Sequence, residues 1–167
     1  ISAGASMVND VWALQHDPGM AEVVAQSGVP VVLMHNQDRT CYDDLIPEMV
    51  ENLQERVEVA IKFGIGADKI ILDPGIGFGK NPQQNLEILH RLGEFSTLGQ
   101  PLLVGTSRKS TIGYVLDLPV DDRLEGTAAT VALSIAGGAD MVRVHDVKQM
   151  VRVARMSDSI VRSFGET

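Results

Sequence analysis

Apolar residues follow two different rhythms along the chain. Short apolar runs, typical of strands buried on both faces, occupy residues 5–11, 29–35, 69–73, 101–106 and 140–145. Apolar residues recur at helical spacing in residues 17–27, 43–64, 82–92, 124–136 and 147–161. Five β-α units without a hairpin signal predict the α/β class, in which a parallel sheet carries its helices outside.

The number of units leaves two architectures open. A closed (β/α)8 TIM barrel typically takes about 250 residues. A chain of 167 residues is therefore either an open doubly wound sheet or the later part of such a barrel. No shift in composition marks a boundary, so residues 1–167 are expected to form one domain. The chain opens Ile-Ser-Ala-Gly-Ala without Met, which favours a start in the middle of a domain.

Composition narrows the class of partner. The net charge of −8 argues against nucleic acid, because phosphate backbones are bound through a basic surface. The single cysteine, Cys41, excludes a disulfide within the chain and favours a reducing, cytoplasmic location. No apolar stretch is long enough to span a bilayer, so no membrane partner is expected.

Three of the predicted strands end in clusters of glycine, charge and hydroxyl groups. These clusters are Asp-Pro-Gly-Ile-Gly-Phe-Gly-Lys at 73–80, Gly-Thr-Ser-Arg-Lys-Ser at 105–110 and Arg-Val-His-Asp at 143–146. The carboxyl ends of parallel strands meet at one edge, and ligands of α/β proteins bind there. We therefore expect a ligand site built from these three clusters.

The first cluster permits a structural and a functional interpretation. Asp73 before Pro-Gly suits an ordinary turn, but it could also accept two donors from a planar, amidine-like edge. The glycine spacing matches neither the dinucleotide fingerprint nor the P-loop, so it indicates close approach of a flat ligand rather than phosphate binding. Phe78 is either a core residue or a surface beneath such a ligand.

The other two clusters carry cations. Arg108 and Lys109 lie at an expected helix start, where positive charge opposes the helix dipole unless an anion is present. Arg143 and His145 are two positions apart on the expected strand 140–145 and should share a face. An interior arginine needs a carboxylate or a phosphate. A lone histidine is more often a hydrogen-bonded core residue, but next to Arg143 at a strand end a ligand contact is favoured for His145.

Weaker candidates end the first two strands. The Asn9 amide offers a donor and an acceptor to a heterocycle, and His35, next to Met34, ranks below His145 as a site residue. No His-x-x-x-His pattern or cysteine pair suggests a metal site.

Together these motifs resemble those of the dihydropteroate synthases. The resemblance runs from Asn-Asp-Val at 9–11 through Leu-Met-His at 33–35 and the three clusters above, over essentially the whole chain. It implies a (β/α)8 barrel and a transferase of folate biosynthesis. Such an enzyme joins 6-hydroxymethyl-7,8-dihydropterin pyrophosphate to p-aminobenzoate with the help of Mg2+, and is usually a homodimer and a sulfonamide target.

The resemblance also implies roles for individual residues. Asn9, Asp73 and Lys109 would read the pterin ring, and Met34 and Phe78 would add apolar contact. Arg143 and His145 would hold the pyrophosphate, so Lys109, Arg143 and His145 would be the catalytic residues. Ser107, Arg108 and Lys109 would frame the p-aminobenzoate site.

The family pattern extends beyond this chain. Its amino-terminal β-α units, with an Asn-Val-Thr-Pro-Asp-Ser-Phe-type loop near the metal and a further Asp, have no counterpart in residues 1–167. No metal ligand is therefore assigned here. Two alternatives stay open: a pterin-binding methyltransferase domain, and a truncated, non-catalytic pterin-binding remnant. Methyl transfer needs no pyrophosphate clamp, so the Ser-Arg-Lys and Arg-Val-His segments favour the synthase.

Overall fold

The strands of the computed structural model, which describes residues 1–163, are all parallel. They are β1 (Val8–Asp10), β2 (Val31–Met34), β3 (Ile70–Asp73), β4 (Leu103–Val104) and β5 (Met141–Val142). β1 pairs with β2 and β2 with β3, β4 pairs with β5, and a bridge from Leu72 to Leu102 joins the two groups. Strands that follow one another in sequence order form an arc of a barrel, because a doubly wound sheet reverses its strand order.

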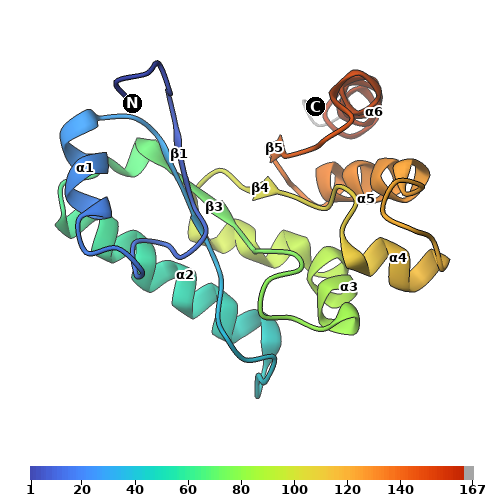
Figure 1. Ribbon diagram of the computed structural model, residues 1–167, viewed down its shortest axis with the longest axis horizontal. Coiled ribbons are helices and arrows are strands. Elements are labelled where there is room, and N and C mark those ends of the chain that lie inside the picture. The colour runs from blue at the N-terminus through green and yellow to red at the C-terminus, as the bar shows by residue number, and fades with distance from the viewer. Residues whose placement is uncertain (164–167) are drawn as a thin grey trace.

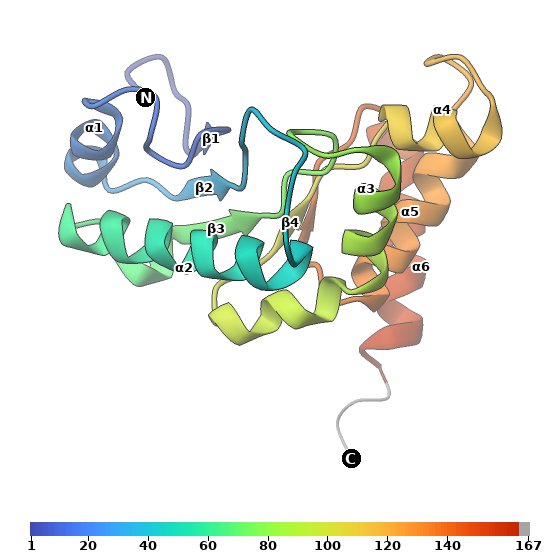
Figure 2. The same ribbon diagram turned by 90° about the horizontal axis from the view of Figure 1, so that it is seen from below.

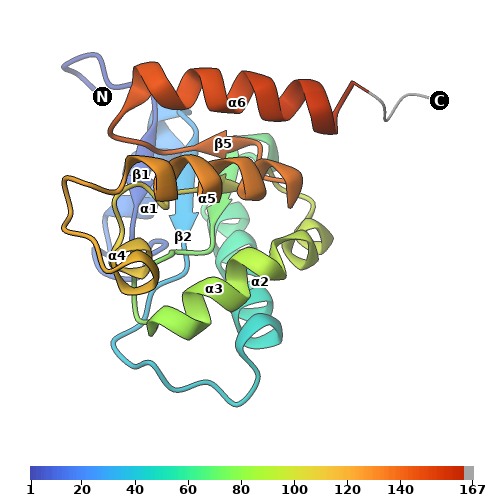
Figure 3. The ribbon, with the colours of Figure 1, turned by 90° about the vertical axis from the view of Figure 1, so that its right-hand side faces the viewer.

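The helices lie on the outer side of this arc, as Figure 1 shows. They are α1 (Met20–Ser27), α2 (Leu45–Lys62), α3 (Pro82–His90), α4 (Ser110–Leu116), α5 (Leu124–Ala136) and α6 (Val147–Val161), with 3-10 turns η1 (Ala67–Lys69) and η2 (Leu92–Leu98). α2 runs along the strands in Figure 2, and α5 and α6 lie side by side next to β5 in Figure 3. Within the part of the chain that the structure describes, no helix has the length and apolarity needed to cross a bilayer.

The core lies between the strands and α2. All four residues of β2 and of β3 are buried, and the apolar stripe of α2 packs onto their outer face through Ile46, Met49 and Leu53. On the inner face, Val32, Ile71 and Leu103 form a separate small cluster, one residue from each of three neighbouring strands. Side chains that layer the inside in this way are a property of barrels.

Local signals explain where several elements begin. Asn81 and Gln84 form a reciprocal capping box: the Gln84 N–H donates to Asn81 Oδ1 at 2.9 Å, and the Asn81 N–H donates to Gln84 Oε1 at 2.8 Å. Pro82 then takes the first helical position, where its missing N–H costs nothing. This cap ends the glycine-rich loop and fixes the direction of α3.

Two expectations about the elements were wrong in extent. The runs 101–106 and 140–145 form strands of only two residues each, so Arg143 and His145 lie beyond β5 rather than on it. Apolar character marks residues that are buried, but a strand ends where its backbone stops pairing. The short helix α4 and the turn η2 were not assigned their own bounds from the sequence.

Candidate active site

A cavity of about 470 Å3 opens at the carboxyl ends of the strands. It receives residues from the ends of β1, β4 and β5 and from the loop after β3. Its lining contains six of the predicted site residues, Asn9, Phe78, Ser107, Lys109, Arg143 and His145, together with Val11, Gly105 and Val144. The three polar clusters therefore do meet at one edge, although their roles toward a ligand stay predictions.

Asp73 combines the two interpretations that the sequence left open. It is the last residue of β3 and only 1% exposed. Its Oδ1 accepts the Gly75 N–H at 2.7 Å, which is a turn contact, while Oδ2 lies 3.1 Å from a terminal nitrogen of Arg143. Burial raises the pKa of Asp73, and the Arg143 charge is the main influence opposing that rise.

Arg143 lies across the cavity, between β1 and β3. One terminal nitrogen donates to Asn9 Oδ1 at 2.6 Å and the other reaches Asp73. The guanidinium passes over Gly105, where a Cβ would stand only 2.8 Å from it. The carboxylate that an interior arginine requires is thus supplied by Asp73.

Lys109 and Phe78 form a second contact inside the cavity. The Lys109 ammonium lies 4.2 Å from the centre of the Phe78 ring, within cation–π range. Burial, and next the charge of Arg143, lower the pKa of Lys109. Phe78 is only half-buried, so its ring faces the cavity rather than the core.

His145 is exposed and is held by Ser107. The Ser107 hydroxyl oxygen accepts the backbone N–H of His145 at 3.1 Å and lies 3.0 Å from its Nδ1. The core interpretation of this histidine is therefore wrong, and its ring stands at the mouth of the cavity with Nε2 free of those contacts.

Four candidates lie outside the cavity lining: Asp73, described above, and Arg108, Met34 and His35. Arg108 forms a two-pronged ion pair with Asp146, at 3.1 and 2.6 Å, so this carboxylate offsets the charge at the start of α4. Met34 is fully buried beneath Gly75. His35 is 3% exposed and contacts Lys80.

Lys80 is a residue whose role the sequence interpretation missed. Its buried ammonium donates to the Phe78 carbonyl at 2.8 Å and to the Gly75 carbonyl at 3.2 Å, and it lies 3.1 Å from His35 Nδ1. Burial lowers the pKa of Lys80 to about 7, while burial and the neighbouring ammonium lower the pKa of His35 to about 3. A cation at the end of a glycine-rich loop was the available signal, and here it holds the loop that carries Phe78.

Arg123 holds the second loop in a similar way. Its guanidinium donates to the carbonyls of Leu118, Arg108 and Lys109 at 2.9–3.2 Å. Gly113 leaves room for it, since a side chain there would collide with the guanidinium. The backbone of the Arg108–Lys109 turn is thereby fixed, and Lys109 is directed at Phe78.

No metal centre is assembled by residues 1–163. No group of three or more His, Cys, Asp or Glu side chains in that range lies close enough together to bind an ion. The buried carboxylate next to the cavity, Asp73, already contacts Arg143. These residues do not fit a Mg2+ site, and we assign no chemical step to a metal.

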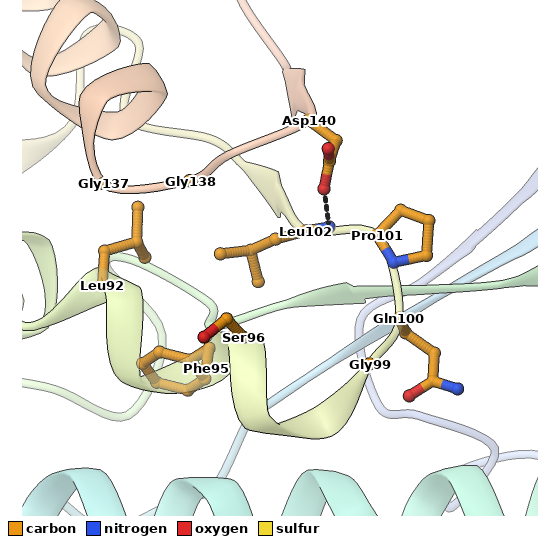
Figure 4. Close-up of a pocket in the computed structure, with 10 residues that line it drawn as sticks. All are labelled: Leu92, Phe95, Ser96, Gly99, Gln100, Pro101, Leu102, Gly137, Gly138 and Asp140. Carbon is orange, nitrogen blue, oxygen red and sulfur yellow. Dashed lines mark hydrogen bonds between the residues drawn. The ribbon is translucent and has the colours of Figure 1, made fainter. Parts of the chain in front are cut away.

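A further cavity of about 350 Å3 lies at the opposite, amino-terminal ends of β4 and β5 (Figure 4). Asp140 borders it and accepts the Leu102 N–H through Oδ2 at 2.9 Å. The other lining residues are uncharged: Leu92, Phe95, Ser96, Gly99, Gln100, Pro101, Leu102, Gly137 and Gly138. This second cavity has no cationic side chain in its lining, whereas Lys109 and Arg143 line the first.

The sequence and the fold match those of known proteins. A sequence model described as "pterin binding enzyme" matches residues 1–145, and the chain belongs to that family. Over 165 residues it is 52% identical to the dihydropteroate synthase of Bacillus subtilis, covering 99% of this chain and 58% of that protein. It is 45% identical over 170 residues to the dihydropteroate synthase of Synechocystis, of which it covers 59%.

Solved structures agree on the fold. The dihydropteroate synthase of Clostridium difficile, crystallised with pteroic acid, superposes with a TM-score of 0.94 at 49% identity, over 96% of this chain and 62% of that one. The Xanthomonas albilineans enzyme with 4-aminobenzoic acid gives 0.91 at 39% identity, over 95% and 59%. The chain has the fold of part of a TIM barrel and spans less than two thirds of the length of these relatives.

Proposed function

We propose that this chain forms the substrate-binding part of a dihydropteroate synthase. The proposed reaction condenses 6-hydroxymethyl-7,8-dihydropterin pyrophosphate with p-aminobenzoate to give 7,8-dihydropteroate and pyrophosphate. The supporting observation is a buried carboxylate, Asp73, next to a cavity of about 470 Å3 whose lining includes the two cations that act on it, Arg143 and Lys109. A flat ring with two donors on one edge suits the carboxylate, and an anionic leaving group suits the cations.

The pterin ring is proposed to occupy the cavity between β1 and β3. Asp73 would accept the N–H groups of the amino-pyrimidinone edge, and the Asn9 amide would bond the same heterocycle. The Phe78 ring, held beneath Lys109, offers one flat face, and Met34 supports Gly75 from below. Lys80 and Arg123 keep the two loops in place without reaching the ring.

The proposed chemistry requires no covalent nucleophile from the protein. The C–O bond between the pterin methylene and the pyrophosphate breaks, and pyrophosphate departs with the electron pair. Arg143 and His145 stabilise that growing negative charge. The aniline nitrogen of p-aminobenzoate, framed by Ser107, Arg108 and Lys109, forms the new C–N bond and loses one proton to solvent.

The remaining parts of the proposal come from family resemblance. They are a requirement for Mg2+, a cytoplasmic location, a homodimer and inhibition by sulfonamides. By that resemblance the Mg2+ ligands are expected in the family's amino-terminal loop, which has no counterpart in residues 1–167.

A binding experiment with a turnover assay tests the function. Binding of 6-hydroxymethylpterin and formation of dihydropteroate are measured with the chain alone and with the chain joined to amino-terminal β-α units of a relative. The proposal predicts pterin binding in both and turnover in the joined form. Binding without turnover in either form would favour the non-catalytic remnant, and methyl transfer to or from a folate would favour the methyltransferase.

A further inference from the structure

Arg143 contacts Asn9 and Asp73, the same side chains that are proposed to bind the pterin. Its two terminal nitrogens contact Asn9 Oδ1 at 2.6 Å and Asp73 Oδ2 at 3.1 Å. The other Asp73 oxygen is already committed to the Gly75 N–H. The second oxygen, Oδ2, is therefore covered by a side chain that follows β5, and Asp73 does not itself line the cavity.

A guanidinium and an amino-pyrimidinone edge have the same recognition chemistry. Each presents parallel N–H donors in one plane to a carboxylate. Gly105 lets the guanidinium approach the backbone closely, because a Cβ at this position would stand only 2.8 Å from it. Asp73, which is 1% exposed, has no room for both partners on one oxygen.

The contact between Arg143 and Asp73 is also one that can be broken. The Oδ2 atom lies near the arginine but forms no hydrogen bond of good geometry to it, and the arginine side chain is 40% exposed. An ion pair with one exposed partner is weak compared with a desolvated one. Lys109 remains close to Asp73 when the arginine leaves, so the carboxylate keeps a neighbouring cation.

We propose that Arg143 is a specificity-determining residue that competes with the pterin for Asp73 until a pyrophosphate group draws its guanidinium away. This inference rests on the proposed function and deepens it. A pterin that lacks pyrophosphate must displace Arg143 without compensation. A pterin that carries pyrophosphate provides a better partner for the same guanidinium, since phosphate oxygens accept its fork of donors. The site thereby favours the activated substrate over its unactivated alcohol.

The test measures coupling between two probes, 6-hydroxymethylpterin and inorganic pyrophosphate. Calorimetry is carried out on the full natural chain at slightly alkaline pH, because burial raises the pKa of Asp73. Saturating pyrophosphate should tighten pterin binding by roughly tenfold, as one charge-assisted contact at Asp73 is exchanged for another. By reciprocity, pterin should tighten pyrophosphate binding equally.

The variant Arg143→Met removes the guanidinium and keeps an unbranched apolar side chain. It should bind 6-hydroxymethylpterin more tightly than the unmodified protein does, by severalfold, and pyrophosphate should no longer change that affinity. The matched control is Arg91→Met, whose guanidinium pairs with Glu87 and Glu94 on the outer surface and should leave both affinities unchanged.

The possible results distinguish failure of this inference from failure of the proposed synthase function. Absence of pterin binding by the unmodified protein refutes the proposed function. If pyrophosphate does not change the pterin affinity of the unmodified protein, the proposed competition is refuted. This measurement uses no variant, so misfolding of Arg143→Met would not affect it. Weaker or equal pterin binding by a folded Arg143→Met also overturns it.

Discussion

Three buried ionisable side chains, Asp73, Lys80 and His35, surround the glycine-rich loop after β3. Each has been taken out of water, which is costly unless partners compensate. The compensation is specific: Asp73 faces Arg143 and the Gly75 N–H, and Lys80 faces backbone carbonyls and a neutral His35. Single substitutions here should therefore separate ligand binding from stability.

Replacing Asp73 with asparagine should weaken pterin binding far more than it weakens the fold. The amide oxygen can still accept the Gly75 N–H, but the charge that faces the ring donors is lost. We expect a loss of about 2 kcal/mol in binding free energy. Calorimetry with a pterin, beside thermal unfolding of the same variant and of the exposed-site control Asp158→Asn, measures both effects. Unchanged pterin affinity would contradict the assignment of Asp73.

The neutral state of His35 should make the fold sensitive to acid. Its pKa falls from 6.5 when unfolded to about 3 when folded, so the unfolded chain binds the additional proton between these values. Stability from this group is complete above pH 6.5 and is lost as the pH falls toward 3, at about 1.4 kcal/mol per pH unit. Urea unfolding across that range should show a shallower pH dependence for His35→Gln than for the unmodified chain, while the exposed-site variant His16→Gln should show no difference.

At the scale of elements, the loop between β3 and α3 is shaped by glycines that approach a neighbouring backbone. Gly75 and Gly79 have φ of +71° and +57°, and a Cβ on either would collide with the carbonyl oxygens of His35 and Gln37 respectively. The loop can therefore pack directly on the chain after β2, and Tyr42 adds a hydrogen bond to the Gly79 carbonyl at 3.1 Å. This close packing places Phe78 in the cavity.

Gly79→Ala should consequently destabilise the fold by more than its backbone conformation alone requires. Gly28 provides the matched control, because it has a similar φ of +63° but open space around the missing Cβ. We expect about 1 kcal/mol of destabilisation for Gly28→Ala from the left-handed conformation, and roughly twice that or more for Gly79→Ala once the collision is added. If urea unfolding shows the same loss of unfolding free energy for Gly28→Ala and Gly79→Ala, the loop after β3 can move to accommodate the added methyl group.

At the scale of the whole molecule, the two ends of the strand arc are the exposed edges of this chain. Among the described residues β1 pairs only with β2 and β5 only with β4. Beside β5, an apolar cavity of about 360 Å3 lies between the strand and α6 and is lined by Val142, Val144, Val147, Met150, Val151 and Ala154 with Arg143. Unpaired strand edges and uncovered apolar faces are sites of association.

The isolated 167-residue chain should therefore self-associate and be inactive as a synthase. Light scattering and a turnover assay test this directly. Met141→Lys places a charge on the β5 edge and should reduce association, whereas Met156→Lys, on an exposed position of α6, should not. A stable monomer with normal turnover would refute the prediction.

Much of the architecture was determined by the sequence alone. The change between continuous apolar runs and helical spacing is a local property, so it defined five β-α units and their order. Parallel strands bring their carboxyl ends to one edge, and for that reason the clusters at 73–80, 105–110 and 143–146 could be expected to meet. The Asn-Pro cap at 81–82 likewise depends on neighbours in the chain.

Only the tertiary structure decided which charges meet. Arg108 pairs with Asp146 across 38 positions, Lys80 reaches His35 across 45, and Arg143 reaches Asn9 across 134. No local pattern encodes such pairs, because a side chain's partner depends on the curvature of the arc and the depth of the surrounding packing. The same reason separates Met34, which the packing buries, from Phe78, which the loop turns toward the cavity. Residue type and strand order predicted where the site lies, whereas long-range packing determined what each of its side chains contacts.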